Sequence, residues 1–167
     1  MRLLAVRHAI AEEREDFART GRDDRLRPLT DEGRKKMRRA ARGLRTLVPE
    51  IDLLATSPLT RAAQTGAILD AVYGDLKTVE IEELAPEAKP AELLAWLATR
   101  KDETIAVVGH EPSLSSIVSW LLTGEERPIL ALRKGGTCLL ELGEEPTAGG
   151  ATLLWALTPA QLRALGG

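Results

Sequence analysis

The chain has 167 residues, a length at which one domain can bury a real hydrophobic core, and we expect a single domain over residues 1–167. Its net charge of -2, from 23 basic and 25 acidic residues, argues against a general nucleic-acid binder. The single cysteine, Cys138, excludes an internal disulfide and a cysteine-rich metal site. No apolar stretch is long enough for a transmembrane helix and the N-terminus does not resemble a secretory signal, so we expect a cytoplasmic protein that does not contact membranes.

The first half of the chain alternates strand-like and helix-like segments. LLAVR (3–7) predicts a buried strand, and the charged segment Ile10–Arg27 has no clear period and is expected to be the least ordered part. DEGRKKMRRAARGLRTL (31–47) has helical spacing and can be capped by Thr30. IDLLATS (51–57) predicts a second buried strand. Ser57 and Pro58 are then expected to cap and open a helix over residues 59–73.

The second half continues the alternation. TVEIEEL (78–84) predicts a weakly marked strand, AELLAWLATR (91–100) a short helix, and TIAVVGH (104–110) another buried strand. PSLSSIVSWLLTG predicts a helix that begins at Pro112 and stops at Gly124. The runs at 136–142 and 150–157 predict an antiparallel hairpin. This pattern indicates the α/β fold class: a three-layer α/β/α sandwich with a mostly parallel sheet and an antiparallel C-terminal hairpin.

Polar residues follow each predicted parallel strand. These are Arg7-His8, the segment from Ser57 to Arg61, Glu82-Glu83 and Gly109-His110. Ligands of open α/β sheets bind outside the carboxyl ends of the strands, so we expect these four pieces to converge on one edge.

Two histidines and two arginines at such an edge predict an anion pocket that contains a nucleophile. The arginine fork matches phosphate oxygens, and nearby positive charge lowers the pKa of a histidine, which keeps its imidazole neutral at pH 7. A neutral imidazole can attack phosphorus, while the arginines and a protonated His110 hold the developing negative charge. This chemistry requires no metal and no cofactor.

Several motifs resemble those of the histidine phosphatase superfamily. Its R-H-G or R-H-A opening resembles Arg7-His8-Ala9, its S-P-x-x-R-x-x-Q-T element resembles SPLTRAAQT (57–65), and its G-H element resembles GHEP (109–112). RPLTDEG (27–33) and EELAP (82–86) further resemble the SixA-type phosphohistidine phosphatases. The resemblance implies a phosphoglycerate mutase-like fold, with His8 as the nucleophile and Arg7, Arg61 and His110 as the phosphate pocket.

Two further residues are weaker candidates for the site. Glu83 is the best positional match for the superfamily's catalytic acid, with Glu82 beside it, although EELAPEAKP lacks the Gly-x-Trp-Glu-like pattern found in many members. Arg27 precedes the Pro-Leu-Thr element and is a substrate-binding candidate, and ordinary surface charge is the alternative.

The resemblance implies a metal-independent phosphatase that forms a covalent phosphohistidine intermediate. The expected substrate is phosphohistidine on a protein partner, such as a histidine-containing phosphotransfer domain. A small-molecule phosphomonoesterase acting on a phosphorylated metabolite is the first alternative. The second is a phosphate-binding interaction module without turnover. Faster hydrolysis of phosphomonoesters than of phosphoramidates would favour the phosphomonoesterase. Tight phosphate binding without product release would favour the interaction module.

Overall fold

Six strands form one mixed sheet in the computed structural model, which describes residues 1–167. The strands are β1 Arg2–Arg7, β2 Leu53–Thr56, β3 Thr78–Glu80, β4 Thr104–Gly109, β5 Thr137–Glu141 and β6 Thr152–Leu157. Their order in the sheet is β3-β2-β4-β1-β5-β6. β1, β2, β3 and β4 pair in parallel, whereas β5 is antiparallel to both β1 and β6. The mostly parallel sheet and its antiparallel C-terminal hairpin are therefore confirmed.

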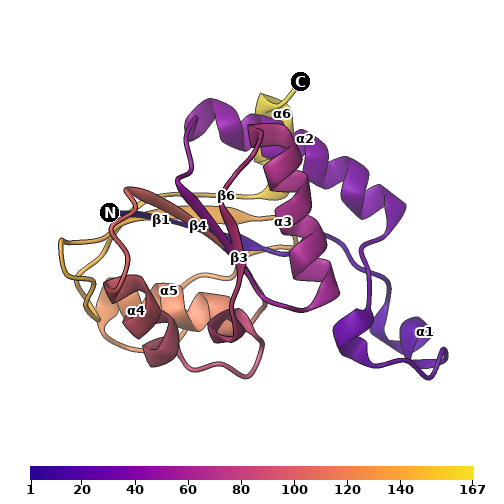
Figure 1. Cartoon of the computed structure of the whole chain (residues 1–167), viewed down its shortest axis with the longest axis horizontal. Coiled ribbons are helices and arrows are strands. Elements are labelled where there is room, and N and C mark those ends of the chain that lie inside the picture. Colours follow the sequence, from indigo (N-terminus) through magenta and orange to yellow (C-terminus); the bar gives the residue numbers. More distant parts are fainter.

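Helices cover both faces of this sheet, as Figure 1 shows. They are α1 Arg14–Ala18, α2 Asp31–Leu47, α3 Thr60–Tyr73, α4 Pro90–Ala98, α5 Ser113–Thr123 and α6 Pro159–Leu165, with short 3-10 turns η1 at Asp24–Leu26 and η2 at Glu82–Leu84. α2, α3 and α6 pack on one face, and α4 and α5 pack on the other. The structure thus has the three layers that the strand–helix alternation predicts.

Two apolar cores lie on opposite faces of the sheet. Alternate residues of β1 contribute to different cores: Leu4 and Val6 join the core under α2 and α3, and Leu3 and Ala5 join the core under α4 and α5. All four are completely buried. Because both faces are covered, the inner positions of β1 and β4 are apolar on both sides, and each buried leucine contributes about 1.5–3 kcal/mol to folding.

The helix boundaries follow the sequence signals with one clear exception. Thr30 caps α2, and its Oγ1 accepts a hydrogen bond from the Gly33 amide at 2.9 Å. α5 ends at Gly124, which has the left-handed φ of 80°, as the stop signal predicts. The expectation that Ser57 caps the next helix is wrong. α3 starts at Thr60, and the Ser57 hydroxyl is instead bonded to His110.

The prediction that Ile10–Arg27 is the least ordered part of the chain is also wrong. This segment contains α1 and η1 and is closed by an antiparallel bridge between Ala11 and Leu29. Phe17 is almost fully buried and anchors α1. A five-residue helix is too short to display an apolar period, so its order comes from this anchor and from backbone hydrogen bonds that the sequence pattern does not reveal.

Sequence analysis did not predict α6, although its starting signal is present. Thr158 and Gln161 form a capping box, and Pro159 occupies the first helical position. Leu162 is completely buried against α2, in the core that also supports β1. The helix α6 thus contributes to the core that packs against β1.

Candidate active site

The register of the parallel strands places the two histidines side by side. Arg7 pairs with Gly109 at the ends of β1 and β4, and the His8 amide donates to the Gly109 carbonyl at 3.0 Å. The two imidazole rings are both buried, with their centroids 5.1 Å apart. Ser57 follows β2 at the same edge, where its amide donates to the Val108 carbonyl at 3.0 Å. Three strand ends therefore meet at one edge of the sheet, as the rule for α/β folds predicts.

The hydrogen bond of His8 defines which ring nitrogen can react. Nδ1 lies 2.7 Å from the carbonyl oxygen of Ala9. A carbonyl oxygen can only accept, so in this contact Nδ1 carries the proton and donates it. In the neutral ring the lone pair is then on Nε2, which is the nucleophilic atom of this tautomer.

Burial, together with nearby positive charge, keeps His8 neutral at pH 7. Burial lowers the pKa of its imidazole to about 4, and the positive charges of Arg61, Arg7 and Arg27 act in the same direction. The hydrogen bond to Ala9 raises this pKa; its effect is smaller than that of burial and larger than that of any one arginine. The histidine therefore stays uncharged beside a group of arginines that attracts anions, as expected from the sequence.

Thr65 of α3 connects His8 with Arg61. Its Oγ1 accepts a hydrogen bond from the Ala9 amide at 3.0 Å and donates to the Arg61 carbonyl at 2.7 Å. Thr65 is completely buried. One hydroxyl thus links the backbone of Ala9, whose carbonyl holds the His8 ring, to the first turns of α3.

Arg7 extends from the last position of β1 to the segment that precedes β5. Its Nη1 donates to the carbonyl oxygen of Leu132 at 2.8 Å. Its Nε is buried and has no hydrogen-bond partner. A buried N–H group without an acceptor carries a free-energy penalty of about 1–3 kcal/mol, which an oxygen of a bound anion would relieve.

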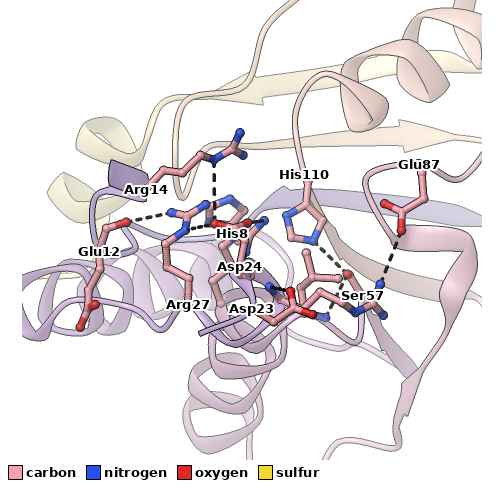
Figure 2. Close-up of polar contacts among 12 residues, drawn as sticks. His8, Glu12, Arg14, Asp23, Asp24, Arg27, Ser57, Glu87 and His110 are labelled. Atoms are coloured by element: carbon pink, nitrogen blue, oxygen red, sulfur yellow. Dashed lines mark hydrogen bonds and ion pairs between the residues drawn. The ribbon is translucent and has the colours of Figure 1, made fainter. Parts of the chain in front are cut away.

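Arg61 and Arg27 converge on one carboxylate, that of Asp24; Figure 2 shows Arg27 and Asp24. Arg27 Nε donates to Asp24 Oδ1 at 2.8 Å, and Arg61 Nη2 lies 3.4 Å from Oδ2. Arg61 Nη1 also donates to the Asp24 carbonyl at 3.0 Å, and Arg27 Nη1 donates to the Glu12 carbonyl at 2.8 Å. The hydrogen bond from Arg27 is the main reason that the pKa of Asp24 is lowered.

Both arginine side chains are nearly inaccessible to solvent, at 8% for Arg27 and 4% for Arg61. Arg27 is therefore a buried member of the cluster around His8 and is not ordinary surface charge. Arg61 Nε, like Arg7 Nε, is buried without a partner. Two unpaired guanidinium donors next to a neutral imidazole are suited to the oxygens of a phosphoryl group.

His110 is held by Ser57. Its Nε2 lies 2.9 Å from Ser57 Oγ, and its Nδ1 is buried without a hydrogen-bond partner (Figure 2). Burial lowers the pKa of His110 to about 3; the charge that His8 carries once it is protonated and the charges of Arg61, Arg27 and Arg7 add to the effect. The expected protonated His110 is thus disfavoured in this structure, because several cations already surround it. A phosphoryl dianion would act in the opposite direction.

Glu83 lies in η2, half-buried, and lines the same small pocket as Gly109, His110 and Leu114. Its neighbour Glu82 is directed toward solvent and lies 3.4 Å from Arg25 Nη2. The structure therefore brings Glu83 to the histidine edge of the sheet and leaves Glu82 outside it.

Two site residues escaped the sequence analysis in different ways. Asp24 was unrecognised because its position depends on the folded course of Ile10–Arg27, for which the sequence offers no period. Ser57 was identified at a strand end but interpreted as a helix cap. A serine hydroxyl suits both a helix cap and a contact with His110. The structure shows that Ser57 is not the cap, because α3 starts at Thr60 and its N-cap residue is Leu59.

Comparison with known proteins assigns the chain to a family. The model of the histidine phosphatase superfamily (branch 1) matches residues 3–90, a range that includes Arg7, His8, Arg61 and Glu83. The chain belongs to the histidine phosphatase superfamily. The protein is accordingly a phosphatase, a hydrolase that acts on phosphorylated substrates.

Individual relatives cover almost the whole chain. An uncharacterised protein from Picosynechococcus sp. strain PCC 7002 is 34% identical over 146 residues, 86% of each chain. The phosphohistidine phosphatase SixA of Escherichia coli K12 is 28% identical over 170 aligned positions, covering 98% of this chain and 97% of SixA. A structure of the protein histidine phosphatase SixA with tungstate superimposes with a TM-score of 0.82 at 24% identity, over 97% of this chain and 99% of the other. This superposition shows the phosphoglycerate mutase-like fold that the motifs imply.

None of the helices is both long and apolar enough to span a membrane.

Proposed function

We propose that this phosphatase removes the phosphoryl group from phosphohistidine on a protein, through a covalent intermediate on His8. The observation that carries the proposal is the Nδ1–H···O=C bond from His8 to Ala9, which leaves the lone pair on Nε2 in the midst of Arg7, Arg27 and Arg61. A neutral nucleophile surrounded by cations is what attack on a phosphoryl dianion requires.

In the first step His8 Nε2 forms a bond to phosphorus while the bond from phosphorus to the substrate nitrogen breaks. The leaving imidazole takes up a proton from solvent water, and the phosphoryl group becomes a phosphoramidate on His8, which keeps its proton on Nδ1. The unpaired Nε donors of Arg7 and Arg61 stabilise the charge on the phosphoryl oxygens. Negative charge on the phosphoryl group raises the pKa of His110, which can then donate a hydrogen bond to it.

In the second step water attacks the phosphorus of phosphorylated His8. The bond between phosphorus and Nε2 breaks, inorganic phosphate leaves, and its new oxygen comes from the water. The Ala9 carbonyl keeps the proton of His8 on Nδ1 throughout, so Nε2 returns with a free lone pair. The nucleophile is thus regenerated without a change of tautomer.

Two observations support phosphohistidine as the substrate. The SixA relative of 28% identity, aligned over 98% of this chain, is a phosphohistidine phosphatase. In addition, imidazole leaves from phosphorus more readily than an alkoxide and needs less protonation, which suits a site whose acid candidate, Glu83, is only half-buried at the edge of the pocket.

Access to the site also suits a side chain presented by a protein. A hollow that is open to solvent lies beside Arg61 and Asp24, between α1 and Pro86. A histidine on the surface of a partner can approach through such an opening. A histidine-containing phosphotransfer domain is the kind of partner that fits.

The same pocket also suits a second candidate, a small-molecule phosphomonoesterase. Glu83 shares a pocket with His110, and a carboxyl group in that position could protonate an alkoxide leaving group. This reading retains His8 and its arginines and changes only the substrate.

The test compares phosphate release, in EDTA, from a phosphohistidine-bearing protein and from a phosphomonoester at equal concentration. Faster release from phosphohistidine is the expected result. Faster release from the ester would leave the roles of His8 and its arginines unchanged and would identify the protein as a small-molecule phosphomonoesterase. The His8→Asn variant serves as the control for spontaneous hydrolysis of the labile phosphoramidate. Wild-type release no faster than with this variant would overturn both candidates.

A further inference from the structure

We propose that Glu111 is a positioning residue for the phosphate-binding guanidinium of Arg7, and that it acts through the backbone of Leu132. The inference rests on the proposed function only in assigning Arg7 to the phosphate pocket. Glu111 follows His110 directly and is half-buried.

The orientation of the Arg7 side chain depends on Leu132. The hydrogen bond from Nη1 to the Leu132 carbonyl, at 2.8 Å, is the one hydrogen bond that this guanidinium makes with the protein. Asp24 holds Arg27 and Arg61 directly, but it forms no ion pair with Arg7. The plane of the Arg7 guanidinium is therefore set by the position of one peptide carbonyl.

Leu132 lies in a segment that has no regular hydrogen-bonding pattern of its own. The chain between α5 and β5 forms neither helix nor strand, although Leu132 itself is 5% exposed and packs in the core beneath α5. Its amide donates to Glu111 Oε1 at 3.1 Å. Leu132 thus receives support from Glu111 on its N–H side and provides support to Arg7 on its C=O side.

The carboxylate of Glu111 is itself fixed. The Ser115 hydroxyl donates to the same Oε1 at 2.6 Å from the first turns of α5. Hydrogen bonds to an ionised acceptor are shorter and about twice as strong as those between neutral groups. A continuous series of contacts therefore leads from α5 through Glu111 and Leu132 to Arg7.

The same segment has a second anchor that offers a matched control. The Ile129 amide donates to the Ser119 hydroxyl at 2.8 Å, three residues before Leu132. Ser119, like Glu111, accepts a backbone N–H from this segment, but its partner makes no contact with Arg7. Loss of the Ser119 bond would loosen the segment without removing the support of the Leu132 peptide.

The experiment measures the affinity for inorganic phosphate by calorimetry, together with kcat and KM on the better of the two substrates above. Misplacement of a binding group by about 1 Å can reduce catalysis about 100-fold, so we expect Glu111→Ala to weaken phosphate binding and raise KM about tenfold. Glu111→Gln keeps an oxygen that can accept from Leu132, and it should retain affinity within about threefold of wild type. Ser119→Ala should behave like Glu111→Gln.

A double-mutant cycle with Arg7→Ala separates positioning from a general effect on folding. If Glu111 acts through Arg7, Glu111→Ala has almost no further effect on phosphate affinity once the Arg7 side chain is absent. Equal losses from Glu111→Ala in both backgrounds, equal losses from Ser119→Ala and Glu111→Ala, or a Glu111→Gln variant as weak as Glu111→Ala would each overturn the inference.

Glu111→Asp, whose shorter side chain withdraws the carboxylate from Leu132, replaces Glu111→Ala in the cycle if the alanine variant does not fold.

An error in the proposed substrate can be distinguished experimentally from an error in the positioning role of Glu111. A wild-type protein that binds phosphate but hydrolyses only the ester would leave the role of Glu111 supported by its own variants.

Discussion

At the residue scale, the arginines around His8 have two effects on it. Burial is the main cause of the lowered pKa of the imidazole; the arginines lower this pKa further and supply the positive charge that a phosphoryl group requires. These effects are compatible because a neutral histidine is a better nucleophile than a protonated one. The arginines that attract the substrate thus add to the effect of burial, which keeps the nucleophile in its reactive form.

The two histidines of the chain allow a direct test of this protonation state by nitrogen NMR. Because burial lowers the pKa of His8 to about 4 and that of His110 to about 3, neither ring should titrate between pH 8 and pH 5.5. The His8 signals should be those of the Nδ1–H tautomer, and His110→Asn assigns them. A titration of His8 near its ordinary pKa of 6.5 would contradict the account.

The role of Glu83 can be separated by leaving group. If its carboxyl protonates the leaving oxygen, Glu83→Gln should reduce kcat on an alkyl phosphate roughly 100-fold, in the range typical of general acid catalysis, and reduce kcat on phosphohistidine far less. Glu82→Gln, whose side chain points toward Arg25, is the matched control and should be near wild type on both. Equal losses with both substrates would show that Glu83 does not act by protonating the leaving group.

At the scale of elements, the site is assembled by three strand ends and one excursion of the chain. β1, β2 and β4 supply Arg7, His8, Ser57 and His110, and the first turn of α3 supplies Arg61. The segment between β1 and α2 brings Asp24 and Arg27 to the same place. Hydrogen bonds between these elements therefore determine the geometry of the pocket.

Thr65 makes the hydrogen bond between α3 and the His8 loop, and its removal tests that connection. Thr65→Val leaves the buried Ala9 amide without an acceptor, so the free energy of unfolding should fall by about 1–3 kcal/mol and kcat/KM should also fall. Thr65→Ser keeps the hydroxyl and removes one methyl group, so it should lose less stability and retain most activity. Chemical denaturation and steady-state kinetics provide the two measurements, and a Ser variant as impaired as the Val variant would contradict this role.

The part of the site that lies at the strand ends could be predicted from the sequence. Arg7, His8 and His110 follow continuous apolar runs, and parallel pairing then brings such ends together whatever the loops do. Asp24 could not be found this way, because its approach to Arg61 depends on the folded course of the segment between β1 and α2, which has no apolar period. The helix α6 is a different case, because the residues of its capping box, Thr158 and Gln161, can be recognised in the sequence directly after the predicted hairpin.

At the scale of the whole molecule, burying two neutral histidines makes stability depend on pH. In the unfolded chain both rings take up a proton below about pH 6.5, whereas in the folded protein their pKa values are about 4 and about 3. The contribution of each histidine is therefore complete above pH 6.5 and is lost progressively as the pH falls toward 4.

The free energy of unfolding should thus decrease between pH 7 and pH 4.5 by on the order of 2 to 3 kcal/mol per histidine. Urea denaturation over this range, compared between wild type and the His8→Asn, His110→Asn double variant, isolates the effect from that of the carboxylates. Parallel curves for the two proteins would show that the histidines are not responsible.

The covalent intermediate on His8 is the central claim, and a rapid-quench experiment tests it most directly. Wild-type protein is mixed with a phosphohistidine-bearing protein, quenched at high pH, where phosphoramidates survive, and digested for mass spectrometry. We expect one transient phosphoryl group, on His8, and none in His8→Asn. A protein that releases phosphate without forming this species, or that carries the phosphoryl group on another residue, would contradict this claim.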